Sequence, residues 1–533
     1  MQMLLQRISN RILEQDMPVD AIFKTLTAVI IIRTVLEKLL STGHRLLFDP
    51  VDFYGCLVGD LHMYFSWVCI FLSMSIPVAV FLRVRYRDAL KLTLIGFCVT
   101  VTVPFVDFIF TGGVGDEIRY FRNFDTFLYN YVNLFNPLAD MKGVTAGVRL
   151  EVATVFFGSL IFSLFGFRRG IVRSLLLAFS LYTIVYLYGY ILPFHHLIGI
   201  DLTTMTHRST TVINGPQALF FAYLIPFALC LVGAAAILAW REKAGGIILS
   251  VLYPRRLLFY LLLLCFGLMF TAWQIGHYPK ILNTPDMLKL VAAAFSISLL
   301  FIYAKLTNDI NDLDIDRVSN RERPLVEGLM SKDDAGRLAF VAMALSGVLA
   351  VPVGRDFFYF WFFIWGLSYV YSAPPFRFRR FWPLNNLIIA VIGTGVFMAG
   401  ASIARPDDFY AALENKEIIA YVLLAFFFCC HLKDLKDIDG DKSEGIFNLF
   451  GHVRYPRALA LIFFGAFMVL VLCIVSLVHM LNAAVIAGTV ICVAVSVGMT
   501  LKSKDLAGLD RLFVVSFIFL IYIAFVWLIH LGR

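Results

Sequence analysis

The feature that most constrains this chain is a succession of apolar segments, each about 20 residues long and separated from the next by a short polar loop. The hydrocarbon core of a bilayer leaves backbone groups without water, so only helices and closed barrels cross it. These segments are too long and too continuous for the alternating strands of a barrel. Only 15% of the 533 residues are charged, against about 25% in ordinary soluble domains. The sequence therefore predicts an all-α polytopic membrane protein.

The C-terminal part, residues 241–533, is predicted to form one domain with nine membrane helices. Lysine and arginine gather in the loops after the second, fourth, sixth and eighth apolar segments, which the positive-inside rule places in the cytoplasm. This alternation accounts for the net charge of +8, so we expect no nucleic-acid partner. The predicted segments are centred near Leu263, Ala294, Met343, Phe363, Val391, Leu424, Val469, Ile491 and Leu520.

Residues 1–240 are predicted to be a separate multi-span membrane domain of unknown function, with five or six helices. The segment Ile22 to Leu40 contains four charged residues, which favours an amphipathic helix at the membrane interface over a span. The five-span pattern and the Asp49-Pro50 pair faintly resemble Yip1-like membrane domains. The clearer spans are centred near Leu72, Val101, Phe157, Tyr182 and Phe227.

Two acidic motifs stand out at the predicted cytoplasmic ends of helices. In Asn308–Asp316, the acids Asp309, Asp312 and Asp316 are spaced at offsets 0, 3 and 7, so a helix presents them on one face. After the sixth apolar segment the same spacing returns. The repetition predicts an internal pseudo-repeat whose acids face one cavity. The second set of acids is Asp434, Asp437 and Asp441.

Carboxylate clusters of this kind favour magnesium, which keeps several waters and prefers one or two carboxylates plus substrate phosphate oxygens. A diphosphate is the expected substrate group, since basic side chains on the same side can hold phosphate oxygens and stabilise a departing diphosphate. Together, metal and cations would lower the barrier to breaking a carbon–oxygen bond. The predicted diphosphate-binding residues are Arg323, Arg377, Arg379, Arg380, Lys433, Lys442 and Tyr371.

These residues resemble motifs of the UbiA superfamily of intramembrane prenyltransferases. Asn308–Asp316 fits the family's NDxxDxxxD motif, and Arg323-Pro324 lies where the family usually has Arg-Pro. The segment Lys433–Asp441 is similar to its second motif. The loop after the fourth segment is also similar, with Tyr371-Ser372, Pro374-Pro375 and the basic run Arg377 to Arg380. The resemblance covers about Tyr253 to Arg533.

The resemblance implies a nine-helix bundle in which aspartates hold two Mg²⁺ ions that bridge to a prenyl diphosphate. Asn308 would line the site near the breaking bond, and the allylic cation would be attacked by a hydrophobic acceptor, either a ring or quinone precursor or a membrane lipid. The implied metal ligands are Asp309, Asp312, Asp316, Asp434, Asp437 and Asp441. The implied catalytic residues are Asn308 and the same aspartates apart from Asp434.

Two alternatives remain open from the sequence. Within the same fold, some relatives transfer a phosphoribosyl group to a polyprenyl phosphate. A cation transporter is the alternative of a different class, but it predicts ionisable residues near the middle of spans, whereas these acids lie at helix ends. With no organelle transit peptide evident, we expect a prokaryotic inner membrane, with the active site facing the cytoplasm.

Overall fold

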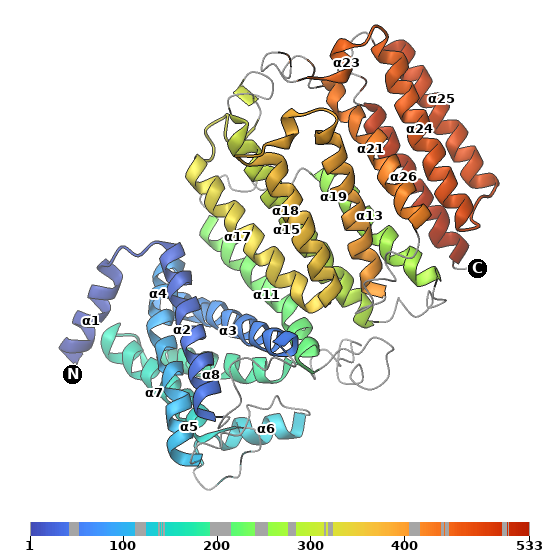
Figure 1. Cartoon of the computed structure of the whole chain (residues 1–533). Coiled ribbons are helices and arrows are strands. Elements are labelled where there is room, and N and C mark those ends of the chain that lie inside the picture. The colour runs from blue at the N-terminus through green and yellow to red at the C-terminus, as the bar shows by residue number, and fades with distance from the viewer. Residues whose placement is uncertain are drawn as a thin grey trace. The chain divides into compact units, whose positions relative to one another are not determined.

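The computed structural model divides the chain into two compact units, Met1–Lys243 and Ala244–Arg533. Within the described residues the regular structure is helical, without strands, as predicted (Figure 1). The assignment of these parts to two domains with separate roles stays a prediction. The structure describes residues 2–41, 53–111, 124–136, 139, 141, 144–191, 215–239, 254–274, 284–313, 316–317, 323–404, 416–436, 438, 442, 447–503, 509 and 511–531.

In the N-terminal unit, helix α3 is the packing centre, since α4, α8 and α11 all lie against it. Helix α7 packs on α8, and a short π-helical turn, Phe162–Gly166, continues α7. The helices of this unit are α1 (Gln2–Glu14), α2 (Val19–Ser41), α3 (Phe53–Leu82), α4 (Tyr86–Phe97), α5 (Val103–Thr111), α6 (Phe124–Asn133), α7 (Ala146–Ile161), α8 (Ile171–Gly189) and α11 (Gly215–Ala239).

Helix α2 covers the segment whose relation to the membrane was ambiguous. It is not among the helices that are long and apolar enough to cross a bilayer. It packs against α3, α4 and α5, and it buries Arg33, which is 1% exposed. The prediction that α2 lies at the interface stays a prediction.

In the C-terminal unit, each predicted span centre lies inside one of the long helices (Figure 1). Short 3₁₀ turns, η3 (Val351–Val353), η4 (Phe378–Arg380) and η5 (Lys433–Lys436), join or end some of these helices. The helices are α13 (Pro254–Gln274), α15 (Thr284–Asn311), α17 (Lys332–Ala350), α18 (Arg355–Ser372), α19 (Leu384–Ala404), α21 (Lys416–Leu432), the short α23 (Leu449–His452), α24 (Pro456–Leu477), α25 (Ala483–Lys502) and α26 (Arg511–Leu531).

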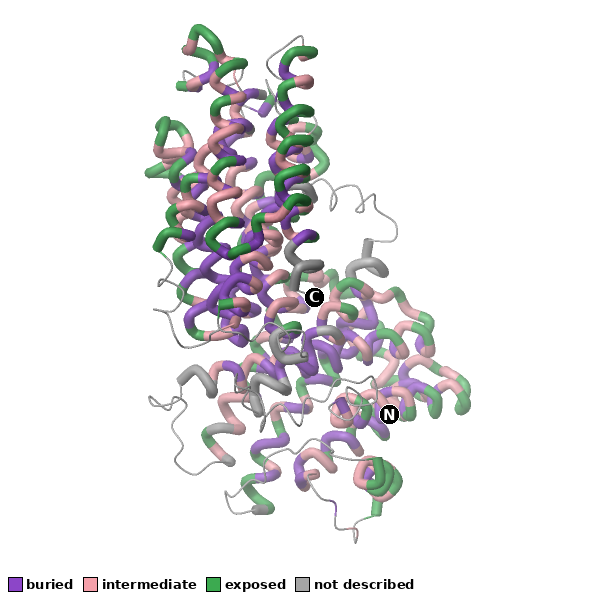
Figure 2. Tube along the Cα trace, turned by 90° about the vertical axis from the view of Figure 1, so that its right-hand side faces the viewer, coloured by how far each residue is buried: buried purple, intermediate pink, exposed green. Residues whose placement is uncertain are grey.

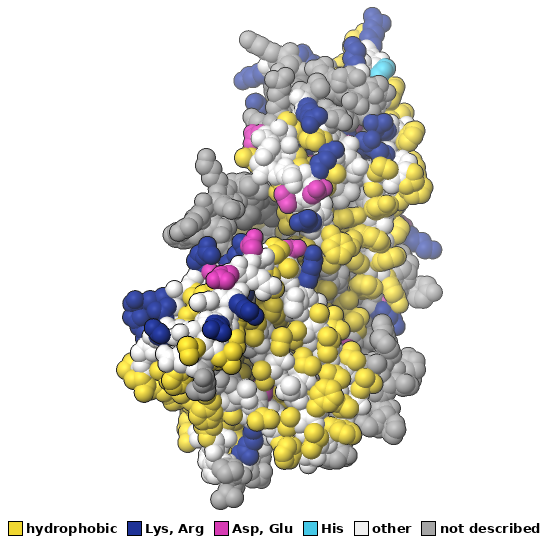
Figure 3. Space-filling view, turned by 90° about the vertical axis from the view of Figure 1, so that its left-hand side faces the viewer, with side chains coloured by type: hydrophobic (Ala, Val, Ile, Leu, Met, Phe, Trp, Pro, Cys, Tyr) yellow, Lys and Arg dark blue, Asp and Glu magenta, His cyan; other side chains and the backbone are white. Residues whose placement is uncertain are grey.

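Ten helices of the described residues are long and apolar enough to cross a membrane. Hydrophobic side chains cover much of the described surface that Figure 3 draws, and basic side chains gather in patches on it. A surface of this composition requires lipid rather than water around it. The chain is an integral multi-pass membrane protein.

Helix α19 forms the core of the C-terminal unit. It contacts α13, α15, α18 and α21, and 83% of its most apolar stretch is buried, against 28% for α25. Figure 2 shows that some helices are mostly buried and others mostly exposed. Two glycines allow α13 and α19 to meet backbone to backbone. A Cβ on Gly267 would overlap the Phe397 carbonyl oxygen, and one on Gly400 would overlap the Leu264 carbonyl oxygen. Small residues at such a crossing are a common device of membrane helices.

We predict that Gly267→Ala lowers the free energy of unfolding by about 2 kcal/mol, because the added methyl group forces two backbones apart. Thermal unfolding in detergent would measure the change. The matched control is Gly465→Ala in α24, where a Cβ meets nothing within 4 Å. Equal midpoints for the two variants would contradict the close approach.

Candidate active site

The first acidic motif continues the helical hydrogen-bond pattern beyond the end of α15. The Asp312 backbone N–H donates to the Asn308 carbonyl at 2.9 Å, and the Asp316 N–H donates to the Asp312 carbonyl at 2.9 Å. Asp309, Asp312 and Asp316 therefore follow one helix face, as their spacing predicts. All three are buried, with exposed fractions of 4%, 1% and 3%.

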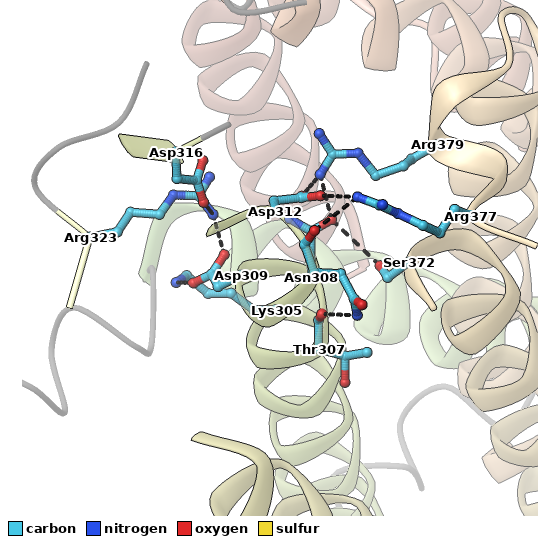
Figure 4. Close-up of polar contacts among 11 residues, drawn as sticks. Lys305, Thr307, Asn308, Asp309, Asp312, Asp316, Arg323, Ser372, Arg377 and Arg379 are labelled. Atoms are coloured by element: carbon cyan, nitrogen blue, oxygen red, sulfur yellow. Dashed lines mark hydrogen bonds and ion pairs between the residues drawn. The ribbon is translucent and has the colours of Figure 1, made fainter. Parts of the chain in front are cut away.

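Two cations hold the outer two carboxylates of this face (Figure 4). Lys305 lies one turn before Asp309, and its Nζ is 2.6 Å from Asp309 Oδ2. Arg323 Nη1 contacts Asp309 Oδ1 and also lies 2.8 Å from Asp316 Oδ2. One guanidinium thus joins the two carboxylates.

Two further arginines reach Asp312 from the turn after α18. Arg379 Nη1 contacts Asp312 Oδ2, and Arg377 Nη2 lies 3.3 Å from Asp312 Oδ1. Arg377 also donates to the Asn311 carbonyl at 2.8 Å. Its backbone is left-handed, with φ of 43°, which is uncommon for a residue other than glycine. The contacts at α15 stabilise this conformation.

Asn308 receives two polar contacts from the same side. Arg379 Nη1 donates to Asn308 Oδ1 at 3.1 Å, and Ser372 Oγ at the end of α18 lies 3.5 Å from the same oxygen. Figure 4 shows Ser372, Arg377 and Arg379 pointing toward Asn308 and Asp312. The end of α18 and η4 therefore orient the Asn308 amide.

The cluster as a whole is an electrostatic arrangement of three buried carboxylates and four cations. A buried charge without a partner is far less stable than a paired one, and loss of one partner from a buried pair typically costs about 3–5 kcal/mol. The cations come from three separate segments, α15, the turn at Arg323 and the turn at η4. Carboxylate charge at the end of α15 therefore fixes the position of two loops.

At the second motif, Asp434 lies in η5, directly after α21. Asn386 Nδ2, at the start of α19, donates to Asp434 Oδ2 at 2.8 Å. Asn448 Nδ2 donates to the Asp434 carbonyl at 2.9 Å. Because η4 also contacts α19, the ends of α18 and α21 and the start of α19 gather at one end of the bundle. Asp437, Asp441 and the side chain of Lys433 lie outside the described residues.

The other predicted residues have different surroundings. Arg380 ends η4 with an exposed side chain, Lys442 is exposed, and Tyr371 is half-buried beside Ser372. Sequence reasoning missed the contacts of Lys305 and Asn386. The position of Lys305, four residues before Asp309, was an available signal for an ion pair on a helix. The sequence carries no such signal for Asn386, because only the fold brings α19 to η5.

The residues of the first motif fit Mg²⁺ by their chemistry, since carboxylate oxygens are its preferred protein ligands. Among the described residues, no three acidic, histidine or cysteine side chains form a group that could hold a metal ion. Such a group is not required, because Mg²⁺ often binds through one or two carboxylates and substrate phosphates. In this structure the neutralising charge on the carboxylates comes from Lys305, Arg323, Arg377 and Arg379.

The fold and this cluster define an all-helical membrane protein with a buried ionic site at one end of a helical bundle. Residues 279–529 match the UbiA prenyltransferase family, and the C-terminal unit belongs to that family.

Several curated proteins and solved structures are similar to this chain, and three of them illustrate the range. Digeranylgeranylglyceryl phosphate synthase of Methanocaldococcus jannaschii is 25% identical over 36% of this chain and 63% of that protein. Chloroplastic chlorophyll synthase of Oryza sativa subsp. japonica is 28% identical over 28% of this chain and 40% of that protein. The chain thus spans less than two thirds of either relative. The structure of a UbiA homologue from Archaeoglobus fulgidus bound to GPP and Mg²⁺ is 20% identical, covers 52% of this chain and 98% of that chain, and has a TM-score of 0.36.

We predict that Arg323→Met lowers the free energy of unfolding by about 3 kcal/mol in EDTA, because Asp316 and Asp309 lose a shared cation. Added Mg²⁺ should restore part of the loss by neutralising the same carboxylates. Thermal unfolding of the purified protein in detergent, with and without Mg²⁺, measures both effects.

The control for that experiment is Arg380→Met, which removes an exposed arginine from the neighbouring turn. Its effect should stay below about 1 kcal/mol, as for other exposed charges. The idea that Arg323 neutralises Asp309 and Asp316 would be contradicted by either of two results. One is an equal loss of unfolding free energy in the two variants, and the other is no effect of Mg²⁺ on Arg323→Met.

Proposed function

We propose that the C-terminal unit transfers a prenyl group from a prenyl diphosphate to a hydrophobic acceptor within the membrane, in a reaction that requires Mg²⁺. The observation that carries the proposal is the pairing of Arg377 and Arg379 with Asp312 on the buried acidic face of α15. In such a cluster the cations can bind the diphosphate and the carboxylates can bind Mg²⁺.

The arginines are suited to bind the diphosphate. A guanidinium forms strong, often bidentate hydrogen bonds with phosphate oxygens, as it does with carboxylates. When the substrate enters, Arg377 and Arg379 exchange Asp312 for phosphate oxygens, and Arg323 does the same at Asp309 and Asp316. Diphosphate binding therefore frees these carboxylates from their ion pairs, and they become available to bind a metal ion.

The released carboxylates of Asp309, Asp312 and Asp316 would hold magnesium, together with the second motif, Asp434, Asp437 and Asp441. Bound Mg²⁺ supplies positive charge that stabilises the departing diphosphate. Asn308, oriented by Arg379 and Ser372, lies beside Asp312 and positions the reacting end of the substrate. Asn386 acts on the other side by fixing the Asp434 carboxylate. Burial of the acidic face keeps water away from the reacting carbon.

The acceptor is proposed as a lipid or a ring compound that partitions into the membrane. The name of the archaeal relative refers to a glyceryl phosphate lipid, and that of the plant relative to chlorophyll. We place the site on the cytoplasmic side, because basic loops follow the second, fourth and sixth helices of the unit. The buried acids lie at the end of α15 rather than along its middle, which disfavours a transport pathway.

We predict that the purified protein in detergent releases diphosphate from at least one member of a panel of prenyl diphosphates when Mg²⁺ and a membrane-lipid extract are present, and that EDTA abolishes the release. Asp309→Asn and Asp312→Asn should each lower the rate by about 100-fold or more, because each removes charge that stabilises the leaving group. A coupled diphosphate assay measures the rates, and mass spectrometry of the extract identifies the product.

The matched control is Asp333→Asn in the first turn of α17, an exposed acid outside the cluster, which should leave the rate unchanged. Full activity of both cluster variants would contradict the proposed roles of the acids. The alternative transferase would be favoured by a different result. In that case no prenyl diphosphate of the panel releases diphosphate, and the protein transfers a phosphoribosyl group from phosphoribosyl diphosphate to a polyprenyl phosphate.

A further inference from the structure

The N-terminal unit contains a large cavity of its own, with a volume of about 460 Å³. Small-molecule sites typically have volumes of about 300–1,000 Å³. Its walls are mostly apolar and come chiefly from α3, α4, α7 and α8. Its described lining residues all belong to the N-terminal unit.

The cavity is elongated. Its lining follows one side of α3 from Met63 to Leu82, and an α-helical rise of about 1.5 Å per residue makes this path roughly 28 Å long. On α7 the lining runs from Val148 to Glu151 and Gly158, and it continues into the π-helical turn after α7. The hydrocarbon core of a bilayer is about 30 Å thick, so a path of this length can hold one long, extended apolar chain.

One part of the cavity is polar. Arg33 of α2 lines it and is 1% exposed, and its guanidinium lies over the Trp67 ring at 4.6 Å. Nη1 pairs with Glu37, while Nε and Nη2 have no hydrogen-bond partner among the described residues. Glu151 of α7, 8% exposed, lines the same cavity. A buried guanidinium with two unused donor groups is expected to bind an oxygen acceptor.

We propose that this cavity binds a long-chain lipid with a single uncharged head, a hydroxyl or a carbonyl, which accepts from Arg33. A hydroxyl head also donates to Glu151. The two carboxylates Glu37 and Glu151 repel an anionic head, and a cationic head has no acceptor for the unused donors of Arg33, so the head is uncharged. The chain fills the apolar path along α3 and α7. This site is separate from the acidic cluster of the C-terminal unit, and the proposal does not depend on the transferase function.

A cavity-filling substitution tests the proposal directly. Gly158 lines the cavity, and a Cβ at this position meets nothing within 4 Å, so Gly158→Leu adds a large side chain at the cavity wall without a backbone clash. The matched control is Gly59→Leu in α3. A Cβ on Gly59 also meets nothing within 4 Å, and Gly59 does not line the cavity.

The full chain in phosphatidylcholine nanodiscs would be labelled with three long-chain probes that carry a diazirine in the chain and differ only in the head, which is a hydroxyl, a carboxylate or a trimethylammonium. We expect saturable labelling of α3 and α7 by the hydroxyl probe, competed by unlabelled long-chain alcohol. Gly158→Leu should lower the labelling by the hydroxyl probe about tenfold, as expected for a tenfold weaker affinity. Gly59→Leu should leave it unchanged.

Arg33→Met tests the head. It should remove the preference for the hydroxyl probe over a fourth probe, which has the same diazirine chain and ends in a methyl group. If this variant fails to fold, the three-probe comparison in the wild-type protein tests the head instead. Labelling that is equal over the whole lipid-facing surface and insensitive to Gly158→Leu would show annular lipid only and overturn the proposal. Stronger saturable labelling by the carboxylate or trimethylammonium probe would overturn the assignment of an uncharged head.

Discussion

The desolvation of carboxylate charge at the end of α15 is the constraint on which the site depends. Asp309, Asp312 and Asp316 are almost completely buried, so their charges need partners. The partners come from α15 itself and from two loops that are separated from it in the sequence. Pairing therefore does two things at once, because it lowers the free energy of the buried acids and holds the loops in place. The same pairing explains why the left-handed backbone at Arg377 is tolerated.

The position of these loops depends in turn on the packing of the bundle. Apolar burial drives helix association weakly in a membrane, because lipid chains are as apolar as the side chains they replace, so close backbone contact contributes more. The glycine-mediated crossing of α13 and α19 is such a contact. It holds α19 in the centre of the unit, where its first turn brings Asn386 to Asp434 while η4 packs against it. A tight crossing in the apolar interior thus sets the geometry of polar groups at the bundle end.

Much of this arrangement was predictable from the sequence, because it depends on local periodicity. Apolar length located the helices, and the offsets 0, 3 and 7 placed three aspartates on one face. The contacts of Asn386 were not predictable, since they require the packing of helices distant in the chain. The conformation of Arg377 was also beyond the sequence pattern, because non-glycine residues rarely adopt it and a tertiary contact compensates for it. That Asp437 and Asp441 of the second motif face the same cavity as the first motif stays a prediction.

Buried cations are paired to a different extent in the two units, and this difference affects which ligands each unit can bind. In the acidic cluster the cations contact the carboxylates directly, so a ligand must displace ion pairs, which only a highly charged group such as a metal diphosphate can do. At Arg33 one nitrogen is paired and two are not, so a ligand needs only to complete the hydrogen bonding. A neutral head with one oxygen suffices there, and the apolar path along α3 accommodates its chain by packing against it. The chain therefore has the physical means to hold a charged substrate group in one unit and an uncharged lipid in the other.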